Sequence, residues 1–178
     1  MKPYRLLLLT SSAPEGRDET VELYAAWARE LYGENVEIKR LRPLEDGFSP
    51  LGYLGVDAAA RLEKRAPGLD ALAHPLAEAA TGLGLPYLAG RNEFRRVVMA
   101  FRPQLIISFQ SFLNRGYFRA AKKILGSEVR CVSVCPHFYA APASPTVGWQ
   151  EGWATPEVDR WLGTSERVVT EAFKRGVP

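Results

Sequence analysis

RLLLLTSSAPEGRD, residues 5–18, is the stretch that indicates the fold of this chain. Leu6 to Leu9 form a continuous apolar run, which is typical of a strand buried on both faces of a parallel sheet. The run ends in hydroxyl residues and the breakers Pro14 and Gly16, and a helical pattern follows. We therefore expect this turn at the carboxyl edge of a sheet, where open α/β folds bind ligands and helix N–H groups are free.

The same alternation of strand and helix continues along the chain. Strands are expected at 4–10, 36–38, 105–109, 129–135 and 160–164, and the clearest helices at 19–31, 92–101, 113–125 and 165–174. Because strands and helices alternate, the sequence predicts an α/β fold: a doubly wound, mostly parallel sheet with helices on both faces. One domain spanning residues 1–178 is expected.

Composition is that of an ordinary soluble globular protein. The 178 residues are 47% apolar and 24% charged, and the net charge of +3 is too small to indicate a nucleic-acid partner. No apolar run approaches the roughly 20 residues of a membrane span, and the leucine run is too short for a signal peptide. Cys131 and Cys135 would lie roughly 13 Å apart on one strand face, too far for a disulfide. Reduced thiols in a cytoplasmic protein, soluble or membrane-peripheral, are therefore expected.

Three predicted loops, 11–18, 110–114 and 136–156, follow strand ends and should converge on one edge of the sheet. Their hydroxyl, amide, arginine and aromatic side chains suit the binding of a polyol or a phosphate. The candidate ligand-binding residues are Ser11, Ser12, Gly16, Arg17, Gln110, Ser111, Tyr139, Trp149 and Trp153.

His137 is the candidate catalytic residue. It follows a buried strand, where an imidazole can act as a base near neutral pH; the alternative is a purely structural histidine. The histidines and cysteines lack the spacing of a metal site, so no metal is expected. The phosphate-loop motif, a complete dinucleotide glycine fingerprint and the serine nucleophile elbow are also absent, which argues against the commonest nucleotide-using enzymes.

The segment 45–55 is apolar but interrupted by glycine and proline. Phe48, Leu51, Tyr53 and Leu54 either pack into the core or form a flap that contacts a membrane or a ligand. The sequence leaves both interpretations open.

Four stretches carry a family resemblance: RLLLLTSSAPEGRDE at 5–19, FRPQLIISFQSF at 101–112, VRCVSVCPHF at 129–138 and WATPEVDRWLGTSERVVTEAFKRGVP at 153–178. Together they resemble the N-terminal, acceptor-binding domain of monogalactosyldiacylglycerol synthases and the related processive diacylglycerol glucosyltransferases. The last stretch is the most specific of the four.

The resemblance implies a Rossmann-like domain of a two-domain GT-B glycosyltransferase acting in glycolipid biosynthesis. In that family this domain binds the diacylglycerol acceptor and touches the membrane, and a C-terminal domain binds the UDP-sugar donor. The donor domain is absent from this chain, so no cofactor is expected within it. The implied location is cytoplasmic, peripheral to the inner face of the cell membrane, with Arg42 and the segment 48–54 helping to contact anionic lipid.

The chain departs from the family pattern at the positions that matter most for catalysis. The family's turn histidine falls at Arg17, and the histidine after its second strand falls at Gln110. Neither arginine nor glutamine is a general base, which leaves His137 as the candidate base. Whether the chain is an enzyme, a hexosyltransferase, therefore stays open.

Three functions remain as alternatives. In the first, the chain is the acceptor-binding domain of a glycolipid glycosyltransferase that works with a donor domain. In the second, it is a non-catalytic module that binds a lipid or polar ligand on the same fold. In the third, it is an unrelated small α/β enzyme that binds a phosphorylated metabolite through Arg17.

Overall fold

The structure, a computed structural model, describes residues 2–11, 18–46, 85–135, 153, 155–163 and 165–174. Its strands are β1 (Tyr4–Leu9), β2 (Val36–Leu41), β3 (Leu105–Ser108), β4 (Arg130–Cys135) and β5 (Arg160–Gly163). They form one sheet in the order β2-β1-β3-β4-β5, and every neighbouring pair is parallel. The predicted α/β, Rossmann-like fold is confirmed.

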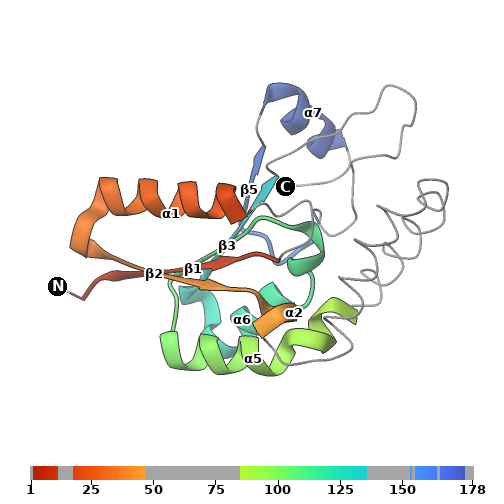
Figure 1. The fold of residues 1–178 in the computed structure, drawn as a ribbon. Coiled ribbons are helices and arrows are strands. Elements are labelled where there is room, and N and C mark those ends of the chain that lie inside the picture. The colour runs from red at the N-terminus through yellow and green to blue at the C-terminus, as the bar shows by residue number, and fades with distance from the viewer. Residues whose placement is uncertain are drawn as a thin grey trace, which may run out of the picture.

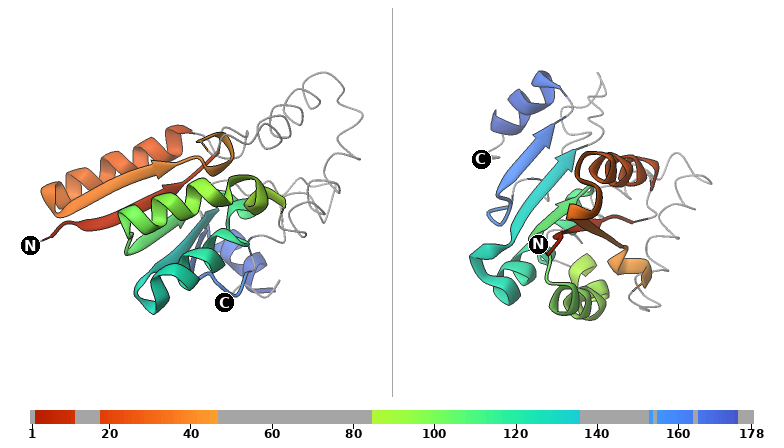
Figure 2. Two further views of the ribbon diagram at one scale, coloured as in Figure 1. Left: turned by 90° about the horizontal axis from the view of Figure 1, so that it is seen from below. Right: turned by 90° about the vertical axis from the view of Figure 1, so that its left-hand side faces the viewer.

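Helices cover both faces of this sheet (Figure 1). They are α1 (Asp18–Tyr32), α2 (Pro43–Asp46), α5 (Leu85–Phe101), α6 (Tyr117–Leu125) and α7 (Glu166–Lys174), with short 3₁₀ turns η1 (Gly33–Asn35), η2 (Ser111–Leu113) and η3 (Gly126–Glu128). Figure 2 shows α1 and α7 on one face and α5 and α6 on the other. Right-handed crossovers place α1 on one face and α5 and α6 on the other, because the chain steps one way from β1 to β2 and the other way from β2 to β3 and β4.

The continuous leucine run is explained by two cores, one on each face of the sheet. Leu7 and Leu9 belong to the core beneath α5 and α6, whereas Leu6 and Leu8 belong to the core beneath α1. Successive side chains of a strand point to opposite faces, so a strand covered on both sides needs an apolar residue at every position.

Tyr117 at the start of α6 joins α6 to α5. Its hydroxyl donates a hydrogen bond to the carbonyl oxygen of Pro86 at 2.8 Å, and its ring meets Tyr87 and Phe94 edge to face. Burial is the main cause that raises the pKa of this tyrosine. Gly90 permits the close approach, because a β-carbon there would lie 2.4 Å from the Tyr117 hydroxyl and 2.5 Å from the Pro43 carbonyl oxygen.

Several element boundaries differ from the prediction. The helix expected at 113–125 begins only at Tyr117, because Gly116 has a φ of +85° and interrupts the helix after η2. Helix α5 begins at Leu85 instead of residue 92, since proline is tolerated in a first helical turn. Strand β2 extends to Leu41, past residue 38.

The apolar pattern of Val21, Tyr24, Ala25, Ala28 and Leu31 predicts one inner face for the helix at 19–31, and one of these positions is wrong. Leu31 is exposed. Six residues after the buried Ala25, at about 100° per residue, Leu31 is rotated roughly 120° around the helix from it.

Candidate functional site

Polar side chains collect at the carboxyl edge of the two central strands. Ser11 follows β1, Gln110 and Ser111 follow β3, and all three are completely buried. The two strands are neighbours in register, with Leu9 opposite Ser108. The structure therefore brings the residues after β1 and those after β3 to the same edge of the sheet, as the sequence predicts for these loops.

Ser108, the last residue of β3, fixes the backbone of the loop that follows. Its hydroxyl donates to the carbonyl oxygen of Gln110 at 2.9 Å and accepts from the Gln110 N–H at 3.4 Å. Asn114 adds a second anchor, because its side-chain amide donates to the hydroxyl of Ser133 in β4 at 2.8 Å. The loop is therefore held by its neighbours and not by the side chain of Gln110.

The side-chain amide of Gln110 has no hydrogen-bond partner within the described residues, at either its oxygen or its nitrogen. The hydroxyl of the adjacent Ser111 is also buried and unpartnered there. Leaving a buried polar group unpaired costs about 1–3 kcal/mol, so native proteins rarely do it without a reason. Three such atoms on adjacent residues make this edge of the sheet the candidate ligand site.

The described side chains of this site carry no charge. Ser11, Gln110, Ser111 and Asn114 offer only hydroxyl and amide groups. Such groups match the donors and acceptors of neutral hydroxyls or amides.

The two cysteines are buried and not bonded to each other, as predicted. Burial raises the pKa of the Cys131 thiol to about 12, so it stays protonated and unreactive near neutral pH. Among the residues that the structure describes, no cluster of histidine, cysteine, aspartate or glutamate could hold a metal ion.

The predicted site residues divide into two groups. Ser11, Gln110 and Ser111 lie together at the edge, and Trp153 is 5% exposed, so little of its ring faces solvent. The remaining predicted residues lie outside the described ones: Ser12, Gly16, Arg17, His137, Tyr139 and Trp149, and the proposed membrane contacts Phe48, Leu51, Tyr53 and Leu54. Their roles stay predictions.

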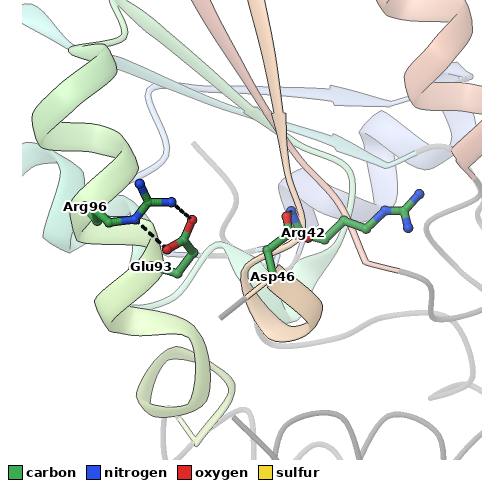
Figure 3. Close-up of polar contacts among 4 residues, drawn as sticks. All are labelled: Arg42, Asp46, Glu93 and Arg96. Atoms are coloured by element: carbon green, nitrogen blue, oxygen red, sulfur yellow. Dashed lines mark hydrogen bonds and ion pairs between the residues drawn. The ribbon is translucent and has the colours of Figure 1, made fainter. Parts of the chain in front are cut away.

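Arg42, expected to help contact anionic lipid, lies just before α2. Its backbone N–H donates to the Asp46 carboxylate at 2.8 Å, which caps this short helix. Figure 3 shows the guanidinium of Arg42 extending away from Asp46.

Asp159 is an organising residue that the sequence analysis did not single out. Its carboxylate accepts hydrogen bonds from the Lys122 ammonium at 2.9 Å and from the Cys131 N–H at 2.7 Å. It thereby joins the start of β5 to α6 and β4. Burial opposes its charged form, but the Lys122 and Cys131 hydrogen bonds and the charges of Lys122 and Arg130 lower the pKa of Asp159 overall. A lone aspartate between polar and apolar neighbours gave no signal of this role.

No protein-family model matches this chain, and no curated protein matches it. Within the described part of the chain, none of the helices has both the length and the apolar character needed to cross a bilayer.

Proposed function

We propose that this chain is the acceptor-binding domain of a glycolipid glycosyltransferase. It presents a hydroxyl of a diacylglycerol-type lipid to a UDP-sugar that a separate donor domain holds. The observation that carries the proposal is the buried carboxamide of Gln110 beside the hydroxyl of Ser111, neither of which has a hydrogen-bond partner among the residues that the structure describes. An alcohol both donates and accepts a hydrogen bond, so one acceptor hydroxyl can satisfy both polar atoms of Gln110.

Two further features support this proposal. The site lies at the carboxyl edge of a Rossmann-like sheet, where such folds bind ligands. The described side chains at the edge are neutral, which suits an uncharged lipid alcohol better than a phosphate. The four family-like stretches of the sequence agree with the same role.

In the proposed reaction, several residues have distinct roles. Gln110, Ser111 and Ser11 hold the acceptor, and His137 takes the proton of its hydroxyl. The acceptor oxygen forms a bond to the anomeric carbon of the sugar, and UDP leaves with the electron pair of the broken bond. The segment 48–54 and Arg42 hold the domain against the inner face of the cell membrane, and the protein is cytoplasmic and peripheral.

Transfer assays test this function directly. The chain is expressed together with the coding sequence that follows it and assayed for transfer from UDP-glucose and UDP-galactose to diacylglycerol in mixed micelles. Replacing Gln110 by Met should lower kcat/KM about 10- to 100-fold, the equivalent of one or two lost hydrogen bonds in a buried site. The matched control is Gln104→Met, which removes an exposed glutamine at the opposite edge. Absence of transfer from every UDP-sugar would contradict the proposal.

A non-catalytic binding module is the second candidate. It is favoured by Gln110 itself, which stands where the resembled family has a histidine and cannot act as a base. Co-sedimentation with diacylglycerol-containing liposomes separates the two functions. Binding that Gln110→Met abolishes, without turnover in the transfer assay, identifies the module.

A further inference from the structure

Helix α1 carries an apolar stripe on the side that faces away from the sheet. Leu23, Trp27 and Leu31 follow one another at intervals of four residues, which places them on one side of a helix. Their side chains are 69%, 63% and 64% exposed. A tryptophan between two leucines is the kind of anchor that dominates binding at protein interfaces.

Acidic residues flank this stripe. Glu30 lies on α1 beside Trp27 and Leu31, and Glu34 follows in η1, after Gly33 with its φ of +54°; both glutamates are exposed. Within the described residues, neither carboxylate takes part in an ion pair or hydrogen bond. The outer face of α1 is therefore complementary to a surface that is apolar and basic.

Helix α5, on the opposite face of the sheet, has that character (Figure 1). Leu88 and Met99 are 52% and 55% exposed, and Arg91 and Arg95 lie between them. Neither arginine is paired within the described part of the chain. The neighbouring Arg96 is already engaged, because it forms an ion pair with Glu93 on the same helix (Figure 3).

The two faces match in charge. Arg91 and Arg95 lie one turn apart on α5, and Glu30 and Glu34 lie at the end of α1 and in η1. With Glu30 against Arg91 in a parallel arrangement, Trp27 lies against Leu88 of α5, because each apolar residue is three positions before its charged neighbour. An antiparallel arrangement with Glu30 against Arg95 would instead set Trp27 against the buried Val98, so the parallel arrangement is favoured.

We propose that α1 of one molecule docks on α5 of a second copy of the chain. The two helices lie on opposite faces of one sheet, so they cannot meet within a molecule (Figure 2). A symmetric pairing of α1 with α1 is disfavoured, because it sets glutamates beside glutamates with no arginine on that face to offset them. The contact is therefore head to tail, and each assembly leaves one α1 and one α5 face open at its ends.

The association is weak. A stable interface buries about 800 Å² on each partner, more than a few turns of two helices supply. Sedimentation equilibrium of the 178-residue chain, from micromolar to millimolar concentration, should show an average mass that rises with concentration. The rise should shrink in about 1 M NaCl, where charge interactions are screened beyond roughly 3 Å.

Charge reversal identifies the faces. Glu30→Arg with Glu34→Arg, and separately Arg91→Glu with Arg95→Glu, should each leave the chain monomeric. An equal mixture of the two double variants should associate again, because each then offers a charge that complements the other. The matched controls are Glu37→Arg with Glu128→Arg, and Arg115→Glu with Lys123→Glu, which change the same charges at exposed positions off the two stripes. Both should associate as the unaltered chain does.

A second measurement does not depend on charge. Trp27→Ala should weaken association at least about 10-fold, since an anchor residue is commonly worth 2 kcal/mol or more. Circular dichroism confirms that each variant is folded.

Three outcomes overturn the proposal. The first is a monomer at every concentration. The second is association that neither charge reversal changes. The third is a monomeric chain whose Arg91→Glu, Arg95→Glu variant loses binding to vesicles of phosphatidylglycerol and phosphatidylcholine, which would assign the basic face of α5 to a membrane instead.

Discussion

At the scale of single residues, Gln110 is expected to lower the stability of the fold, because its buried polar side chain has no hydrogen-bond partner among the described residues. Its backbone is tied to Ser108, but its buried carboxamide has no partner in the described structure. Asn114, also fully buried, donates to Ser133. Within the described residues, one buried amide is therefore hydrogen-bonded to the fold and the other is not.

Replacing Gln110 by Met should leave the free energy of unfolding unchanged or raise it by about 1 kcal/mol, because an unpaired buried amide is replaced by an apolar side chain of similar size. Urea denaturation measures this change. Asn114→Leu serves as the contrasting variant and should lower the free energy by about 1–3 kcal/mol, since it leaves the Ser133 hydroxyl without its donor. A large loss of stability in Gln110→Met would show that the carboxamide supports the fold.

Asp159 is the opposite case, a charged residue whose hydrogen bonds hold the fold together. Asp159→Asn should lower the free energy of unfolding by about 1–2 kcal/mol at pH 7, because it removes a charged acceptor for Lys122 and for the Cys131 N–H. Glu157→Gln, which loses an ion pair with the largely exposed Arg119, should cost no more than about 1 kcal/mol.

The effect of Asp159 should depend on pH with a defined sign. The pKa of Asp159 is lowered in the folded protein, so its contribution is complete above the unfolded pKa of roughly 3.9 and is lost as the pH falls through the folded value. The difference in stability between the unaltered chain and Asp159→Asn should therefore be constant near neutral pH and shrink below about pH 4. A gap that widens in acid would contradict this assignment.

At the scale of elements, the sequence predicts the strands better than the helix ends. A buried parallel strand can be recognised in the sequence as an unbroken apolar run, and Leu6–Leu9 and Leu105–Ile107 are both such runs. Helix boundaries depend on single backbone conformations: the positive φ of Gly116 delays α6, and no periodicity in the sequence reports it.

Gly90 determines how closely α5 approaches α2 and α6. Gly90→Ala should lower the free energy of unfolding by more than about 2 kcal/mol, because the added methyl group meets the Tyr117 hydroxyl and the Pro43 carbonyl and the helices must separate. Thermal denaturation followed by circular dichroism checks this.

Gly33→Ala is the control for the Gly90 substitution. Its φ is +54° and nothing lies within 4 Å of the position of an added β-carbon, so it should cost only about 1 kcal/mol of backbone strain. Equal losses in the two variants would remove the packing role assigned to Gly90.

At the scale of the whole molecule, the sheet should be most stable at its centre. β1 and β3 are each paired on both sides, and the residues of β1 from Leu6 onward are buried, whereas much of β2 is exposed. Amide hydrogen exchange followed by mass spectrometry should be slowest in residues 6–9 and 106–108 and faster in β2 and β5. Faster exchange at the centre than at the edges would contradict this order.

The site could be predicted from the sequence only in part. The apolar runs predict where β1 and β3 end and that the two strands are parallel. This prediction places Ser11, Gln110 and Ser111 at the same edge of the sheet. That Asn114 is paired while Gln110 is not depends on where β4 sets Ser133, a long-range contact that a single sequence does not report. The role of Asp159 was missed for the same reason, since Lys122 and Cys131 lie far from it along the chain.

The bonds that Ser108 makes to the backbone of residue 110 have a consequence for protein engineering. Because these bonds involve only the backbone of that residue, they persist when the buried side chain is exchanged for another of similar size. Saturation mutagenesis at this position should accordingly return several folded variants, which circular dichroism identifies.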